Sequence, residues 1–182
     1  MADMTHPPHA RGSRMPVELA AGACAAACVW QEDRWTHCVD GQNSSQAGSQ
    51  SGRQSGWQSV EGPWPHDGDP RWPASPVLVE LSRVQAAGGP AIVGVGLAGR
   101  THFSASIAPD ARCPDAIRFE IAARLHEASG WLGSTYRSGG QLLRIVATDE
   151  GTSLPRTVSW SYSIGPQGIF GVVGATVVTE QA

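Results

Sequence analysis

Residues 101–137 read THFSASIAPDARCPDAIRFEIAARLHEASGWLGSTYR and contain the clearest structural pattern of the chain. In residues 101–108 and again in residues 117–125, apolar side chains occupy every second position. A period of two places one set of side chains on each face of a strand. We therefore predict two antiparallel strands, each with one face in a core and one in water. The helix-forming residues at 122–128 leave a short terminal helix as the alternative. The positions expected to face the core are Phe103, Ala105, Ile107, Ile117, Phe119, Ile121 and Ala123.

The same kind of pattern extends in both directions from this stretch. Two β-prone runs flank the pair Glu32-Asp33, which predicts a hairpin. The apolar residues 91–97 include Gly94 and Gly96, which is typical of a buried strand that a neighbour approaches closely. Further strands are expected at residues 77–84, 101–108, 117–125, 141–148, 158–164 and 169–179. The sequence thus predicts an all-β fold, an antiparallel sandwich or partly open barrel of about eight to ten strands.

The domain organisation follows from length and composition. A chain of 182 residues that is 41% hydrophobic can bury one real core. We expect residues 1–15 to be a disordered tail and residues 16–182 to be a single β-rich domain. Within it, the Ser/Gln/Gly-rich residues 40–58 predict a flexible loop, and the five prolines in residues 60–76 predict irregular structure.

Charge and cysteine content narrow the functional classes. The formal net charge is −3, and the arginines are scattered without forming a basic patch, which argues against nucleic-acid binding. No apolar run reaches the ~18 residues of a membrane-spanning helix. Four cysteines are too few for a disulfide scaffold in a chain of this length, so we expect reduced thiols and a cytoplasmic location. Secretion or lipoprotein export remains the alternative because residues 15–28 have some features of a signal peptide.

Two groups of side chains have metal-binding chemistry but unsuitable spacing. Cys24, Cys28, His37 and Cys38 offer zinc ligands, yet the second pair is adjacent in a predicted strand and its side chains point to opposite faces. Asp67-Gly68-Asp69 lacks the glutamate that would complete a calcium loop. We expect no metal and no cofactor.

The predicted strand at residues 101–108 also carries His102 and Ser104, a combination used in nucleophilic catalysis. Residues two apart on a strand point side by side rather than at each other, and neither Ser104 nor Ser134 lies in a G-x-S-x-G motif. A solvated polar face is therefore the preferred interpretation of His102, Ser104 and Ser106.

The most suggestive surface feature is the expected loop at residues 130–140, in which glycines surround aromatic side chains and an arginine. Aromatic residues and arginine dominate binding hot spots, although a loop that closes the end of the sandwich would use similar residues. The sequence thus predicts a non-enzymatic module that binds a protein or a small molecule. The alternative is a hydrolase-like enzyme with a His102/Ser104 or Ser134 site. The predicted binding residues are Trp131, Ser134, Tyr136, Arg137, Trp64 and Trp72.

Overall fold

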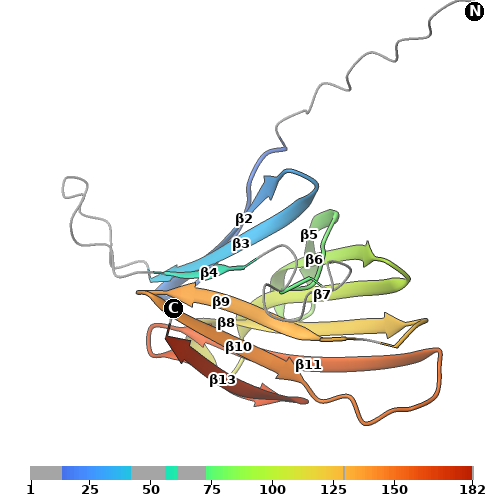
Figure 1. Ribbon diagram of the computed structural model, residues 1–182. Helices are drawn as coiled ribbons and strands as arrows, with labels where there is room; N and C mark the ends of the chain where they lie inside the picture. Colours follow the sequence, from blue (N-terminus) through green and yellow to red (C-terminus); the bar gives the residue numbers. More distant parts are fainter. Residues whose placement is uncertain (1–13, 42–55, 61–72, 129, 182) are drawn as a thin grey trace, which may run out of the picture.

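The computed structural model describes residues 14–41, 56–60, 73–128 and 130–181, and these form an all-β sandwich of two antiparallel sheets (Figure 1). The first sheet has seven strands in the order β1-β2-β3-β4-β9-β10-β13, and the second has six in the order β12-β11-β8-β7-β6-β5. The fold class predicted from alternation is therefore confirmed.

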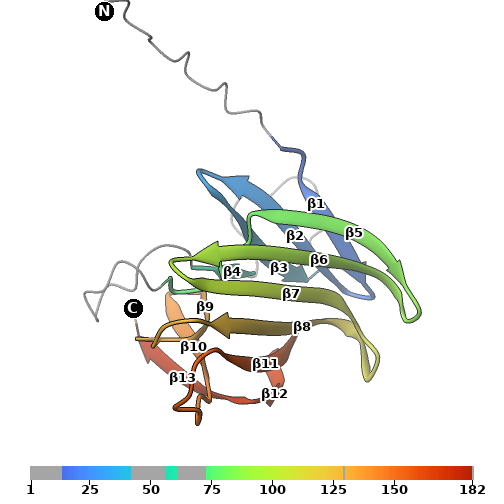
Figure 2. The ribbon, with the colours of Figure 1, turned by 90° about the vertical axis from the view of Figure 1, so that its right-hand side faces the viewer.

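The strands of the seven-stranded sheet are β1 (Val17–Ala21), β2 (Cys24–Gln31), β3 (Arg34–Gly41), β4 (Trp57–Ser59), β9 (Gly133–Ser138), β10 (Gln141–Ala147) and β13 (Ala175–Gln181). The strands of the six-stranded sheet are β5 (Glu80–Ala86), β6 (Gly89–Ala98), β7 (Thr101–Asp110), β8 (Cys113–Leu125), β11 (Arg156–Gly165) and β12 (Gly168–Val173). Figure 2 shows β5, β6, β7 and β8 running side by side across the second sheet.

Strands β7 and β8, which were predicted from residues 101–108 and 117–125, form the middle of the six-stranded sheet. In β7 and β8 the apolar positions face the core as predicted, with Phe103, Ile107 and Phe119 each at most 4% exposed. Strand β8 continues to Leu125, so the helical alternative for its end is wrong. The favourable alternation over this length outweighs the helix propensity of Ala122-Ala123-Arg124 because every second residue gains a place in the core.

The predicted hairpin around Glu32-Asp33 is also confirmed, as β2 and β3 pair from Gln31↔Arg34 onward. Glu32 adopts a left-handed conformation with φ of 54° at this turn.

The strand count differs from the expected eight to ten, because the described residues form thirteen strands. Two segments of the chain are divided at glycines. The Ala-rich N-terminal segment turns at Gly22, where φ is +50°, and becomes β1 and β2. The predicted strand at residues 169–179 bends at Gly174, where φ is +68°, so that β12 and β13 belong to different sheets. A left-handed conformation of this kind is accessible to glycine at little cost.

Strand β6 is only partly the buried strand that its sequence predicts. Ile92 is fully buried, but Val95 is 51% exposed and Leu97 is 49% exposed. The expectation of a close neighbour is confirmed: a Cβ atom at Gly96 would lie 1.9 Å from the carbonyl oxygen of Val77. The segment before β5 therefore packs directly against the backbone of β6.

Several expectations concern residues outside the described ranges. They are the tail up to residue 13, most of the 40–58 loop, and residues 61–72 with Trp64, Trp72 and the Asp67–Asp69 pair.

Two boundaries need correction. Arg14, assigned to the tail, places its guanidinium 3.7 Å from the Trp30 ring centroid and donates a hydrogen bond to the Val79 carbonyl. Trp57, assigned to the loop, begins β4 and pairs with Val39.

Candidate functional site

The predicted recognition loop at residues 130–140 is instead mostly a hairpin arm. Residues 133–138 form β9, which pairs with β4 on one side and β10 on the other. Because side chains alternate along a strand, alternate residues of this segment enter the core. Tyr136 is 0% exposed and Ser134 is 1% exposed. Trp131 is half-buried and Arg137 is exposed, so these two residues can still contact a partner.

The buried residues of β9 join the two sheets through hydrogen bonds. The Tyr136 hydroxyl lies 2.7 Å from the Tyr162 hydroxyl of β11, in the opposite sheet. Beside this pair, the Trp160 indole donates a 3.1 Å hydrogen bond to the Ser134 hydroxyl. Both tyrosines of the chain thus lie in the core and bond to each other. Ser134 and Tyr136 were predicted to contact a ligand at the surface. They instead connect the two sheets through hydrogen bonds in the core.

His37 extends this hydrogen-bonded chain. Its Nε2 atom lies 2.7 Å from the Tyr136 hydroxyl, and its ring lies against Phe119 with centroids 5.2 Å apart. Burial lowers the pKa of His37 to about 4, because the charged imidazolium would lose its hydration between the sheets. His37 is therefore neutral near pH 7 and serves as a polar element of the core.

Two of the cysteines that were considered with His37 as zinc ligands lie in the core. Cys24 and Cys28 are buried, and burial raises the pKa of the Cys28 thiol to about 12, which keeps it protonated and unreactive. Among the residues that the structure describes, no three His, Cys, Asp or Glu side chains gather as metal ligands would. In the same residues, no helix is long and apolar enough to cross a membrane.

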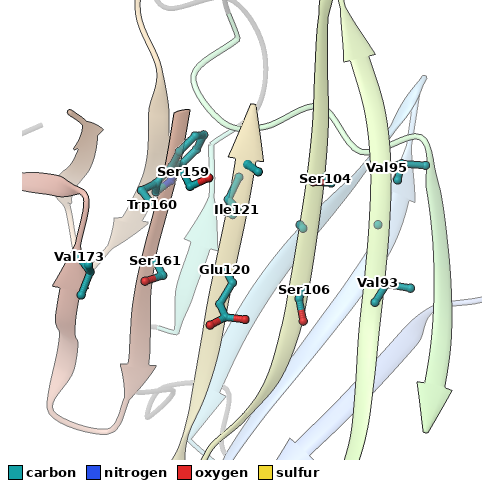
Figure 3. Close-up of a pocket in the computed structure, with 13 residues that line it drawn as sticks. Val93, Val95, Ser104, Ser106, Glu120, Ile121, Ser159, Trp160, Ser161 and Val173 are labelled. Atoms are coloured by element: carbon teal, nitrogen blue, oxygen red, sulfur yellow. The ribbon is translucent and has the colours of Figure 1, made fainter. Parts of the chain in front are cut away.

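A groove crosses the outer face of the six-stranded sheet, on the side away from the core (Figure 3). Its volume is about 560 Å³, within the ~300–1,000 Å³ typical of small-molecule sites. The strand register aligns the side chains in rows across the sheet. One row contains Val95, Ser104, Ala122 and Ser159, and the next contains Val93, Ser106, Glu120, Ser161 and Val173.

The shape of the groove follows from the sizes of these side chains. The three central strands contribute only serine and alanine to the first row, which makes a low floor. Valines stand on both sides: Val95 is 51% exposed on β6, and Val173 is 62% exposed on β12. An outward sheet face is normally covered by longer polar side chains, so a floor of serine and alanine leaves the backbone and the apolar Cβ atoms open to a ligand.

Glu120 is the one charged residue in the lining of this groove. Figure 3 shows its carboxylate between Ser106 and Ser161, which are its cross-strand partners. The nearest cation on the same face of β8 is Arg118, whose guanidinium donates to Ser161 and to the carbonyl of Gly171. Arg118 is therefore engaged with β11 and β12, and the Glu120 carboxylate is the charged acceptor that the groove offers.

The residues of the alternative catalytic prediction lie at one end of the same face. His102 and Ser104 both point outward from β7 and line a second hollow of about 520 Å³, which adjoins the groove at Val95, Ser104 and Ala122. The His102 ring lies against His126, with centroids 5.7 Å apart. Within the described residues, no hydrogen bond joins His102 to Ser104, as expected for neighbours two apart on a strand. Ser134 is bonded to Trp160 in the core.

The groove was missed in the sequence because its residues were interpreted as a solvated face. The available signal was the size of the outward side chains. In the row formed by Ser104, Ala122 and Ser159 they are serine or alanine, whereas exposed strand positions commonly carry threonine or other larger residues.

Comparison of the chain with protein-family models, with curated proteins and with solved structures found no match.

Proposed function

We propose that this protein is a non-enzymatic binding module whose ligand is a small molecule held in the groove of the six-stranded sheet. The observation that supports this proposal best is the combination of an apolar hollow of about 560 Å³ with one charged group, Glu120, between two serines. Ligand sites are mostly apolar and contain few polar groups that fix orientation.

The composition of the groove suggests the chemistry of its ligand. The low floor of serine and alanine and the valine walls suit a compact, mostly apolar ring system. The Glu120 carboxylate accepts hydrogen bonds and attracts positive charge, so the ligand should carry an ammonium or hydroxyl group on that body. Because Glu120 is exposed, its contribution is modest, on the order of 1 kcal/mol or about fivefold in affinity.

A matched set of ligands tests both parts of the proposal. Naphthylmethylamine, naphthylmethanol and naphthoate share one ring system and differ in the polar group. In calorimetric titrations with the full chain, we expect the amine to bind most tightly and the carboxylate most weakly. Glu120→Gln should reduce the advantage of the amine over the alcohol. Absence of binding by all three compounds at millimolar concentration would contradict the proposal.

Two tryptophan substitutions locate the site. Ala122→Trp places a large side chain on the groove floor and should abolish binding of all three compounds. Ala20→Trp is the control, because Ala20 is an exposed alanine of β1 in the other sheet. The groove would be excluded as the site if both variants lost binding equally, or if neither variant lost binding.

Two further sequence predictions remain proposals. Trp131 and Arg137 are accessible for a protein partner, and a variant with alanine at both positions tests that role by partner capture.

The hydrolase alternative has His102 and Ser104 together on the rim of the adjoining hollow. Labelling by a fluorophosphonate that disappears in Ser104→Ala would favour it, and absence of labelling would remove it.

We also propose a cytoplasmic location, which is supported by four cysteines that are all free thiols in this structure. Fractionation of cells producing the native chain, followed by detection of the protein, tests this assignment.

A further inference from the structure

Strand β13 forms one edge of the seven-stranded sheet, and β10 is its one partner among the described strands. The run from Thr176 to Thr179 is exposed on both faces, with Val177 44% exposed and Val178 43% exposed. The free side of such a strand presents unpaired backbone N–H and C=O groups, which can pair with another strand.

The other three sheet edges carry features that oppose such pairing. Strand β1 has the exposed Glu18, and β5 has the exposed Glu80 and Arg83. Strand β12 pairs irregularly with β11 and contains Gly171 in a left-handed conformation, with φ of +61°. Charges and irregular backbone are the usual protections of an edge strand.

Strand β13 lacks these protections. Its residues, ATVVTEQ, include neither proline nor glycine, and its pairing with β10 is regular over all seven positions. Its one charged residue, Glu180, is bound to Arg144 of β10 at 2.8 Å. The edge is therefore regular, β-branched and nearly uncharged.

We propose that β13 pairs in an antiparallel manner with β13 of a second copy of this chain. The midpoint of Ala175–Gln181 is Val178, so a two-fold axis at that residue lets all seven positions pair. In this register Val178 faces itself, Thr176 faces Glu180, and Val177 faces Thr179. No charged residue faces a like charge, and a hydroxyl faces each carboxylate. The strand is thus complementary to itself, as an isologous dimer interface requires.

The dimer joins the two seven-stranded sheets into one continuous sheet. It leaves the ligand groove open, because the groove lies on the six-stranded sheet. The dimer and the ligand site are therefore independent, and either can fail without the other.

A charge exchange at the two-fold axis tests the register. Analytical ultracentrifugation of the full chain should show a dimer. Val178→Lys and Val178→Glu should each be monomeric, because each places like charges opposite one another. An equimolar mixture of the two variants should again form a dimer, since lysine then faces glutamate. Circular dichroism checks that each variant is folded.

The control is Val93→Lys, which alters a valine of similar exposure, 38%, on the other sheet and should leave the dimer intact. A native chain that stays monomeric at high micromolar concentration would overturn the proposal. So would a Val178→Lys dimer, or a mixture of the two charged variants that remains monomeric.

Discussion

Acidification should destabilise the fold through His37, which is neutral between the two sheets. Burial lowers its pKa from 6.5 in the unfolded chain to about 4 in the folded one. Between these values the unfolded state binds more protons than the folded state, so the free energy of unfolding decreases as the pH falls. The full contribution is present above pH 6.5 and is lost on approaching pH 4.

The size of this effect follows from the difference of about 2.5 pKa units between the two states. At 1.36 kcal/mol per unit, protonation of His37 costs about 3 kcal/mol of stability. This cost is a large fraction of the ~5–15 kcal/mol that is the usual free energy of unfolding of a domain. The chain of hydrogen bonds through Tyr136 to Tyr162 connects the two sheets at this point, so the loss affects the packing of the whole sandwich.

The assay is urea unfolding, followed by circular dichroism, of the native chain and of His37→Gln from pH 4 to pH 7. Glutamine retains a hydrogen-bonding group for Tyr136 but cannot take up a proton in this range. Protonation of carboxyl groups and of the other histidines changes the free energy of unfolding of both proteins equally. The difference between the two stabilities should therefore change by about 3 kcal/mol over this range. Parallel curves for the two proteins would show that protonation of His37 does not destabilise the fold.

Two other predictions concern the contacts that fix the sandwich. Tyr162→Phe removes the hydrogen bond between the Tyr136 and Tyr162 hydroxyls, which should cost about 1 kcal/mol in urea unfolding; an unchanged midpoint would show that this bond contributes nothing. Gly96→Ala places a Cβ atom 1.9 Å from the Val77 carbonyl oxygen and should lower the melting temperature substantially. Gly88→Ala is the control, because a Cβ atom at Gly88 has no other atom within 4 Å and should have little effect. Equal melting temperatures of the two variants would contradict the close approach of Gly96 to Val77.

The sequence was sufficient to predict the fold class because alternation in β7 and β8 is an intrinsic property of each strand. Phe103, Ile107 and Phe119 need no knowledge of their partners to be assigned to the core. Strand boundaries at Gly22 and Gly174 were harder, because a glycine within a strand is compatible with either continuation or a turn.

The site was predictable only in part, because it depends on which strands become neighbours. Tyr136 resembles a surface aromatic residue until its partner Tyr162, 26 positions later, is brought opposite it in the other sheet. Ala122 and Ser159 have no distinctive chemistry individually. They form a groove floor because β8 and β11 pair in one register, and a slip of either strand by one residue would turn its own residue inward.

Binding of a small molecule in the groove is tested most directly by amide chemical shifts of the isotope-labelled full chain during titration with naphthylmethylamine. We expect saturable shifts at the floor residues Ser104, Ala122 and Ser159, which lie in one row of the six-stranded sheet. Shifts confined to Trp131 and Arg137, or no saturable shifts at millimolar ligand, would contradict it.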